Sequence, residues 1–237
     1  MNMPNIYGFN KCSEIGIDTF APSIFLGGCN LRCPYCMNSK LISSQPDIKT
    51  IDLGIVKQYV EKEKCEWLMI SGGEPTCTQI GPLFKLLEEI KSWGCKIGMS
   101  TNGTNPEILK SIISYLSYVA MDIKASDNED LESIGNKETS FDVIRSHIIL
   151  LQTDKDREDF TFEVRTTLYP PYIKEEQVRN IGQMLNKKEK WVFQQFRHAK
   201  KMFDPECANI KPYTLEEVQV LVEIAKEYTE GVELRYV

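Results

Sequence analysis

The sequence predicts an α/β fold, a partial (β/α)6 TIM-like barrel that remains open. Along the chain, short runs rich in β-branched and aromatic residues alternate with amphipathic stretches of helical spacing. This alternation is typical of parallel strands joined by right-handed helical crossovers. Six such units are fewer than the eight that close a (β/α)8 barrel, so we expect an open sheet.

The expected elements follow one another without a repeat, a low-complexity tract or a long linker. We therefore predict one domain over residues 1–237, with a core at about 20–200 and a C-terminal extension at 201–237. The six strands are expected at Ser23–Gly28, Glu66–Ser71, Lys96–Thr101, Tyr118–Lys124, Phe160–Leu168 and Trp191–Phe196. The helices are expected at Leu53–Glu63, Ile80–Trp93, Pro106–Tyr115, Phe141–Gln152 and Lys174–Leu185. The extension adds a helix at Thr214–Tyr228, with Thr214 and Glu217 as a capping box, and a strand at Val232–Tyr236.

The composition is that of a folded protein, with 42% hydrophobic and 26% charged residues. Its net charge of −6 disfavours nucleic acid and anionic membranes as partners. The first ten residues lack the pattern of a signal peptide, and no apolar run is long enough to span a bilayer, so we expect a cytoplasmic protein. Thiols stay reduced in that compartment, so clustered cysteines indicate metal rather than disulfides.

Three cysteines follow the first strand in one short loop, with the spacing C-x3-C-x2-C at Cys29, Cys33 and Cys36. Three thiolates can hold three corners of an iron–sulfur cubane and leave one iron open for a chelating ligand, whereas four cysteines occupy every iron. Gly27 and Gly28 allow the backbone to approach such a cluster closely. Zinc is the alternative, but zinc sites usually add a second Cys or His pair. The remaining cysteines form no second closely spaced set and are expected to be structural: Cys12, Cys65, Cys77, Cys95 and Cys207.

Polar residues follow the next three strands, where ligands bind in parallel sheets. After the second strand, Gly72 and Gly73 expose backbone groups and Glu74 supplies a carboxylate, although a Gly–Gly pair also marks ordinary turns. After the third strand, Ser100 and Asn102 supply short hydrogen-bonding side chains in a segment that also suits a helix cap.

The fourth strand places Asp122 and Lys124 on one face, where they form either a functional pair or a surface ion pair of little energetic value. On the fifth strand, Glu163, Arg165 and Thr167 share the face expected to line the barrel. Arg165 suits two roles equally: it could bind a carboxylate of a ligand, or form a structural ion pair with Glu163 or Asp122. The sixth strand ends in Gln194 and Gln195, of which one points inward.

The cysteine loop, with Tyr35 at the aromatic position of C-x3-C-x-aromatic-C, resembles the signature of the radical S-adenosylmethionine (SAM) superfamily. This resemblance implies a [4Fe–4S] cluster on Cys29, Cys33 and Cys36, and SAM as the second cofactor. It places Tyr35 near the adenine. It also implies that Gly72, Gly73 and Glu74 bind the SAM amino group, that Ser100 and Asn102 make polar contacts to SAM, and that Lys124 of an Asp-x-Lys motif meets the SAM carboxylate. Asp122 and Arg165 complete the expected cofactor-binding set.

The whole chain resembles, more narrowly, the activating proteins of anaerobic ribonucleoside-triphosphate reductase. The motifs recur in order from Tyr7–Lys11 to Ile210–Tyr213, through the Arg-Thr-Thr and Gln-Gln-Phe segments. Met37 stands where that group usually has His. The resemblance implies that flavodoxin or ferredoxin supplies an electron, that SAM is cleaved to methionine and a 5′-deoxyadenosyl radical, and that this radical takes a hydrogen atom from a glycine of the partner reductase.

Two alternatives remain open from the sequence. A small-molecule radical SAM synthase, such as a 7-carboxy-7-deazaguanine synthase, would share the SAM residues and use Arg165, Gln194 and Gln195 for its substrate. A non-enzymatic iron–sulfur or zinc module would explain the cysteine loop but leave the strand-end motifs to coincidence. Maturases with auxiliary clusters are disfavoured, because only Cys207 follows Cys95.

Overall fold

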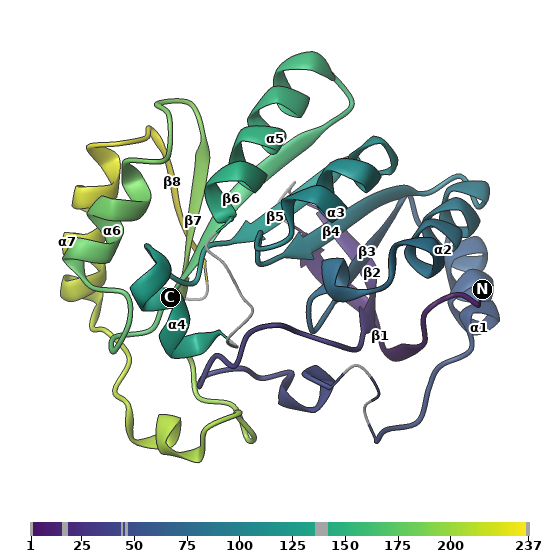
Figure 1. The fold of residues 1–237 in the computed structure, drawn as a ribbon, viewed down its shortest axis with the longest axis horizontal. Coiled ribbons are helices and arrows are strands. Elements are labelled where there is room, and N and C mark those ends of the chain that lie inside the picture. The colour runs from purple at the N-terminus through teal and green to yellow at the C-terminus, as the bar shows by residue number, and fades with distance from the viewer. Residues whose placement is uncertain (1, 16–18, 44, 46, 136–141, 236–237) are drawn as a thin grey trace.

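The computed structural model describes residues 2–15, 19–43, 45, 47–135 and 142–235. Its centre is one eight-stranded sheet whose strands lie side by side in the order in which they occur along the chain (Figure 1). The first strand is antiparallel to the second, and all later neighbours are parallel. The strands are β1 (Ile6–Ile15), β2 (Thr19–Leu26), β3 (Trp67–Gly72), β4 (Lys96–Thr101), β5 (Tyr118–Asp122), β6 (Thr161–Leu168), β7 (Lys190–Gln195) and β8 (Gly231–Arg235). This arrangement confirms the predicted open, parallel α/β fold.

The six expected strands correspond to β2–β7, and the structure extends the sheet at both edges. β1 pairs with β2, and β8 pairs in parallel with β7 from Lys190–Gly231 to Gln194–Arg235. The strand predicted in the C-terminal extension is therefore a seventh parallel strand of the same sheet. Its last predicted residue, Tyr236, lies outside the described residues.

Helices cover the outer face of the sheet (Figure 1). They are α1 (Leu53–Glu63), α2 (Ile80–Ser92), α3 (Pro106–Ile112), α4 (Asn128–Ile134), α5 (Val143–Asp156), α6 (Glu175–Gly182) and α7 (Leu215–Lys226). The predicted capping box is confirmed, because Glu217 N donates to Thr214 Oγ1 and Thr214 N donates to the Glu217 carboxylate. Phe141, the predicted start of the fifth helix, lies outside the described residues, and the described helix begins at Val143.

The α4 helix was not expected from the sequence. It has only seven residues, and it begins where the Asp127 carboxylate accepts a hydrogen bond from Asp130 N. Leu131 and Ile134 are its buried residues, and they pack with Leu31 and Cys33 of the cysteine loop. A helix of two turns with two apolar positions is too short to show a helical period, which explains why the pattern was missed.

The main core lies between the sheet and the outer helices, where fully buried residues such as Ile24, Ile70 and Leu86 form one cluster. A smaller cluster of Ala21, Met69, Tyr118 and Ala120 fills the inner face of the sheet. Among the described residues, no helix has the length and apolar character needed to cross a membrane.

Candidate functional site

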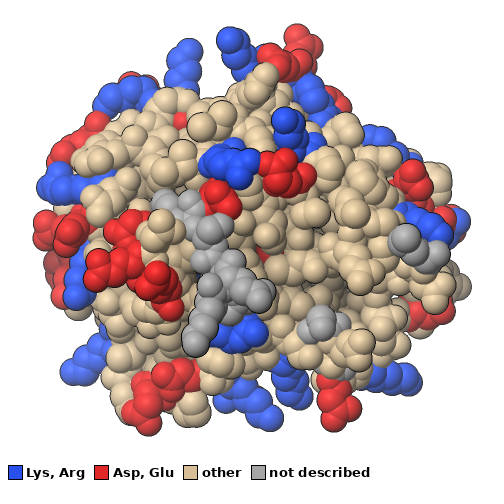
Figure 2. Space-filling view, in the orientation of Figure 1, with Lys and Arg blue, Asp and Glu red and all other residues tan. Residues whose placement is uncertain are grey.

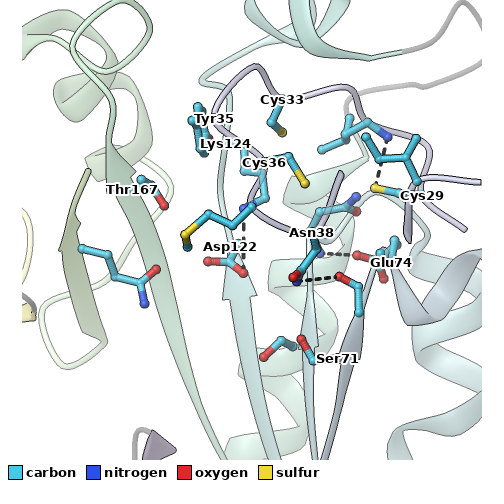
Figure 3. Close-up of a pocket in the computed structure, with 18 of the residues that line it drawn as sticks. Cys29, Cys33, Tyr35, Cys36, Asn38, Ser71, Glu74, Asp122, Lys124 and Thr167 are labelled. Carbon is cyan, nitrogen blue, oxygen red and sulfur yellow. Dashed lines mark hydrogen bonds and ion pairs between the residues drawn. The ribbon is translucent and has the colours of Figure 1, made fainter. Parts of the chain in front are cut away.

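A cavity of about 280 Å³ lies at the carboxyl ends of the parallel strands. Figure 3 shows the cysteine loop on one side of this cavity and the ends of the strands on the other, with Ser71, Asp122 and Thr167 pointing from the strand ends. The lining residues come from the cysteine loop and from β3 to β7, so the strand ends and the loop build one site. The cavity contains the three predicted cluster ligands and all but one of the predicted cofactor-binding residues: Cys29, Cys33, Cys36, Tyr35, Gly72, Gly73, Glu74, Ser100, Asn102, Asp122 and Lys124.

The cysteine loop is held by backbone hydrogen bonds at both of its flanks. Cys29 N donates to Ile42 O at 3.0 Å, and Arg32 N donates to Ile134 O of α4 at 2.5 Å. Inside the loop, the Arg32 guanidinium donates to Cys29 O and Leu31 O, each at 2.8 Å. These contacts fix the loop so that the three sulfurs face the same cavity.

The donor set of this cavity fits an iron–sulfur cluster with one open iron. Burial raises the pKa of Cys29 to about 12 and that of Cys33 to about 11, and it raises the pKa of Cys36 in the same direction. Buried thiols of this kind need a metal to become thiolates, because a coordinated thiol is deprotonated. No three His, Cys, Asp or Glu side chains in the described ranges converge as ligands of a single ion would. A cubane binds each cysteine through a different iron, so its ligands are spread around the cluster.

Gly72 and Gly73 allow the end of β3 to approach β2 more closely than any side chain permits. Gly72 has a φ of 127°, and a Cβ there would lie 2.2 Å from Leu26 O. A Cβ on Gly73 would lie 2.1 Å from Gly28 O. The amide of Gly73 is itself used by β2, because it donates to Leu26 O at 2.9 Å. The glycine pair therefore joins the cysteine loop to β3, in addition to lining the cavity.

Glu74 is 1% exposed, and its carboxylate already accepts four hydrogen bonds from the chain. Thr76 donates through its amide at 3.0 Å and its hydroxyl at 2.6 Å, while the Thr101 hydroxyl and the Asn102 amide donate at 2.7 and 2.6 Å. Burial raises the pKa of Glu74, and these four hydrogen bonds oppose that shift. The carboxylate thus connects the end of β3 to the end of β4. Glu74 also lines the cavity, and its expected contact with a cofactor amino group stays a prediction.

Ser100 and Asn102 both line the cavity, but the Asn102 side chain has partners of its own. Its carboxamide donates to Asn30 at 2.9 Å and accepts from the Thr104 hydroxyl at 2.7 Å. Asn30 belongs to the cysteine loop, so this contact links β4 to that loop. The helix cap suggested by the sequence is not formed, because Asn105 at the start of α3 makes no side-chain cap hydrogen bond, and the bond from Thr104 N to Asn102 Oδ1 at 3.0 Å lies in the preceding turn.

Asp122 and Lys124 lie at the cavity wall, as predicted from their spacing on one strand face, and Figure 3 shows them side by side. The Lys124 ammonium and the Asp122 carboxylate are 3.9 Å apart. Burial works to lower the pKa of Lys124, but the electrostatic contributions of Asp122, Tyr35, Cys33 and Cys36, with Asp122 first among them, together outweigh burial and the pKa is raised. Lys124 is therefore a positive charge available at the wall of the cavity nearest to Cys33 and Cys36.

Tyr35 lies against a group of aromatic residues on the side of the cavity away from β3. Its ring centroid is 4.7 Å from that of Tyr169 and 6.5 Å from that of Phe196. Burial raises the pKa of Tyr35, so the phenol is neutral. Tyr169 Oη and Cys207 Sγ are 3.2 Å apart, which agrees with a structural role for Cys207. All eight cysteines fall within the described residues and all are free.

Arg165 is the one predicted cofactor-binding residue that the structure places outside the cavity lining. Its guanidinium donates to Glu163 at 2.5 Å and to Tyr118 Oη at 3.0 Å. Glu163 is 1% exposed and also receives two hydrogen bonds from Arg235, at 2.7 and 2.9 Å. The expectation that Arg165 contacts the cofactor is thus corrected in favour of the structural ion pair with Glu163. The physical reason is that a buried carboxylate needs cationic partners.

The sequence does not single out several of the lining residues: Asn38, Ser71, Phe196 and Arg197. Thr167 also lines the cavity, on the strand face that the sequence predicts to line the barrel. Asn38 gave no sequence signal, although its amide donates to Gly72 O at 3.2 Å and so ties the cysteine loop to β3. Gln194 and Gln195 both line the cavity, whereas the sequence predicts that one of them points inward. The Gln195 amide nitrogen donates to Tyr213 O at 2.7 Å, and Gln195 Oε1 is buried without a hydrogen-bond partner.

Comparison with known proteins adds to this geometry. The sequence model of the radical SAM superfamily matches residues 23–184. The protein called "Putative glycyl-radical enzyme activating enzyme MJ1227" of Methanocaldococcus jannaschii is 28% identical over 90% of this chain and 87% of its own length. A 7-carboxy-7-deazaguanine synthase of Hyperthermus butylicus is 32% identical over 37% of each chain. Among solved structures, TYW1 with a lysine–pyruvate adduct bound is similar over 88% of this chain and 73% of that chain, with a TM-score of 0.56 at 16% identity, a likeness that concerns the fold.

Proposed function

The chain belongs to the radical SAM superfamily, whose members use a [4Fe–4S] cluster and SAM, and from this premise we propose that it is a glycyl-radical enzyme activase. The proposed partner is an anaerobic ribonucleoside-triphosphate reductase, and the proposed electron donor is flavodoxin or ferredoxin. The observation that carries the proposal is the extent of the match to the Methanocaldococcus jannaschii relative, which covers nearly the whole of both chains.

The residues at the cavity fit both cofactors. Cys29, Cys33 and Cys36 would hold the cluster, and Lys124 supplies a positive charge for the carboxylate of SAM. When bound and reduced, the cluster supplies the electron that splits SAM into methionine and a 5′-deoxyadenosyl radical. The protein binds the cofactors, fixes their orientation and excludes water.

Three groups of this chain perform that positioning. Glu74 joins the ends of β3 and β4 through four hydrogen bonds, so the floor of the cavity is rigid before any ligand binds. Tyr35, supported by Tyr169, forms an apolar wall suited to the face of a purine. Gln195 Oε1 offers a buried acceptor to an N–H or O–H group of a ligand in the cavity.

A 7-carboxy-7-deazaguanine synthase is the second candidate, because relatives with that name share identity with part of the chain. Arg165, which suited a substrate-binding role in the sequence, is bound to Glu163 and Tyr118, whereas Gln194 and Gln195 line the cavity. We prefer the activase because the match to the Methanocaldococcus jannaschii relative extends over 90% of this chain and the match to the Hyperthermus butylicus synthase over 37%.

The test is anaerobic reconstitution of the full chain with iron and sulfide, followed by SAM, a reductant and the reductase encoded in the same genome. We expect 5′-deoxyadenosine together with the doublet of a glycyl radical in the electron paramagnetic resonance spectrum. The Cys33→Ala variant is the control and gives neither product. Formation of 7-carboxy-7-deazaguanine without a glycyl signal would replace the activase by the synthase.

A further inference from the structure

One side of the cavity mouth is formed by residues 197–203, which connect β7 to the 3-10 turn at Pro205–Asn209. At its beginning, Arg197 lines the cavity. At its end, Phe203 N donates to Cys36 O at 3.1 Å, and the next amide, that of Asp204, donates to Pro34 O at 2.9 Å. The segment thus runs from the wall of the cavity to the cysteine loop and borders the opening between them.

Two large apolar side chains are exposed on this border. The bond from Phe203 N to Cys36 O places the backbone of Phe203 beside that of Met37, which follows Cys36 in the chain. Met37 is 65% exposed and also lines the cavity, while Phe203 is 45% exposed. A single exposed apolar residue needs no explanation, but a pair at the mouth of a ligand cavity is a feature of interaction sites.

The same border is positively charged in an acidic protein. Residues 197–203 contain three basic residues, Arg197, Lys200 and Lys201, and no Asp or Glu, whereas the whole chain has a net charge of −6. Arg197, Lys200 and Lys201 are exposed. Asp204, the next residue, caps the 3-10 turn by accepting a hydrogen bond from Glu206 N at 2.9 Å and keeps its charge, so residues 197–204 carry three basic side chains and one acidic one.

We propose that Met37, Arg197, Lys200, Lys201 and Phe203, here called the rim, form a docking surface for an extended segment of a partner polypeptide. That segment carries an apolar side chain, which covers Met37 and Phe203, next to acidic residues, which meet Lys200 and Lys201. The inference rests on the proposed function, and it specifies the chemistry of the partner segment that delivers its glycine to the cavity.

The opposite border of the cysteine loop has the reverse charge. α4 packs on Leu31 and Cys33 and has Glu129 and Asp130 in its first turn. Figure 2 shows acidic side chains gathered on the left of the molecule, over α4 and the neighbouring α6 and α7. A segment that is acidic along its whole length would be repelled there. The acidic residues of the partner segment therefore lie on one side of its glycine, and this polarity sets the direction in which the segment crosses the mouth.

The experiment measures binding of the reconstituted, SAM-loaded enzyme to the anaerobic reductase from the same genome. The first variant is Lys200→Glu/Lys201→Glu, with Lys62→Glu/Lys110→Glu as a control that changes the net charge equally on exposed helical positions. The second is Phe203→Ser, with Ile148→Ser as its control, because Ile148 is 56% exposed on α5. We expect each rim variant to weaken binding about tenfold or more, as loss of a central interface residue does. We also expect the wild-type affinity to fall as salt increases.

Formation of 5′-deoxyadenosine without the reductase is measured in parallel and should stay within about twofold of wild type in all four variants, since none changes a residue that lines the cavity. If wild type forms the glycyl radical and the rim variants bind as tightly as their controls, the rim is not the docking surface and the activase proposal stands. If wild type produces 5′-deoxyadenosine but neither binds the reductase nor forms the radical, the activase proposal fails and the docking inference fails with it.

Discussion

Substitution of Arg165 distinguishes the structural role that we assign to this residue from the cofactor contact suggested by the sequence. Arg165 and Arg235 both donate to Glu163, whose side chain is 1% exposed. Lys190 is a further cation at 3.7 Å from the same carboxylate. Glu163 is thus the anion shared by these cations. Removing Glu163 should therefore change the free energy of unfolding by a different amount than removing one of the cations.

The magnitudes follow from which groups remain unpaired. Arg165→Gln removes one charge-assisted hydrogen bond, worth about 1.5–3 kcal/mol, and the donor to Tyr118 Oη, while Glu163 retains Arg235. Relief from burying one guanidinium offsets part of this loss, so we expect about 2 kcal/mol of destabilisation. Glu163→Gln leaves the Arg165 guanidinium without its anion and Arg235 with Glu233 alone, and breaking a buried pair in this way costs about 3–5 kcal/mol.

Equilibrium urea unfolding of the apoprotein measures both values. With a slope of about 2.5 kcal/mol/M, the midpoint should fall by about 0.8 M in Arg165→Gln and by about 1.6 M in Glu163→Gln. In the double variant, loss of Arg165 relieves the repulsion from Arg235, so the effects of the two single variants should not add.

Kinetics of the reconstituted enzyme complete the test. The KM for SAM should be unchanged in Arg165→Gln, because the guanidinium does not line the cavity. An unchanged urea midpoint together with a KM raised tenfold or more would refute the structural assignment and restore Arg165 as a cofactor ligand.

Three further predictions concern the titration of Glu163, the backbone at Gly72 and the role of Cys33 as a ligand of the iron–sulfur cluster. Burial works to raise the pKa of Glu163, but the hydrogen bonds from Arg235 and the charge of Arg165 lower it below 4.5. The stabilisation from this carboxylate is therefore complete above that pH and is lost as the pH falls through the lowered pKa. The urea midpoints of wild type and Glu163→Gln should converge in acid, and a difference that stays constant with pH would contradict this. Gly72→Ala should prevent folding or lower the urea midpoint far more than Gly94→Ala. Both glycines have positive φ, but only at Gly72 would the added Cβ lie 2.2 Å from a carbonyl oxygen. Equal effects of the two substitutions would show that the close approach of the strands is unimportant. Cys33→Ala should bind far less iron on reconstitution than wild type, whereas Cys207→Ala, at another buried cysteine, should bind as much. Similar iron contents in the two variants would show that Cys33 is not a ligand of the iron–sulfur cluster.

The extent to which the sequence predicts this molecule depends on how local each feature is. The strands and the long helices have periodic patterns within a single segment, so their positions agree with the structure to within a few residues. The cysteine spacing is equally local. By contrast, the pairing of Arg165 with Glu163 depends on Arg235, which lies 72 residues from Glu163 and on the last strand. No local pattern connects these positions, and the sequence left the role of Arg165 open for that reason.

The mouth of the cavity shows the same limit from the functional side. Asn38 and Phe203 give no signal in the sequence, yet the side-chain amide of Asn38 ties the cysteine loop to Gly72 O, and the backbone amide of Phe203, independently of its side chain, holds the same loop at Cys36 O. Their importance arises only when the chain returns to the loop in three dimensions.

Glu74 shows how one buried carboxylate can organise a site. It accepts four hydrogen bonds from Thr76, Thr101 and Asn102, three of them at Oε1 and one at Oε2, and it also lines the cavity. Its charge orders backbone and hydroxyl donors at two strand ends, and Asn102 in turn contacts Asn30 of the cysteine loop. A buried carboxylate is costly unless its oxygens are satisfied, and these donors offset that cost. They hold Glu74 at the wall of the cavity, so its predicted contact with a cofactor amino group is compatible with its role between the strand ends.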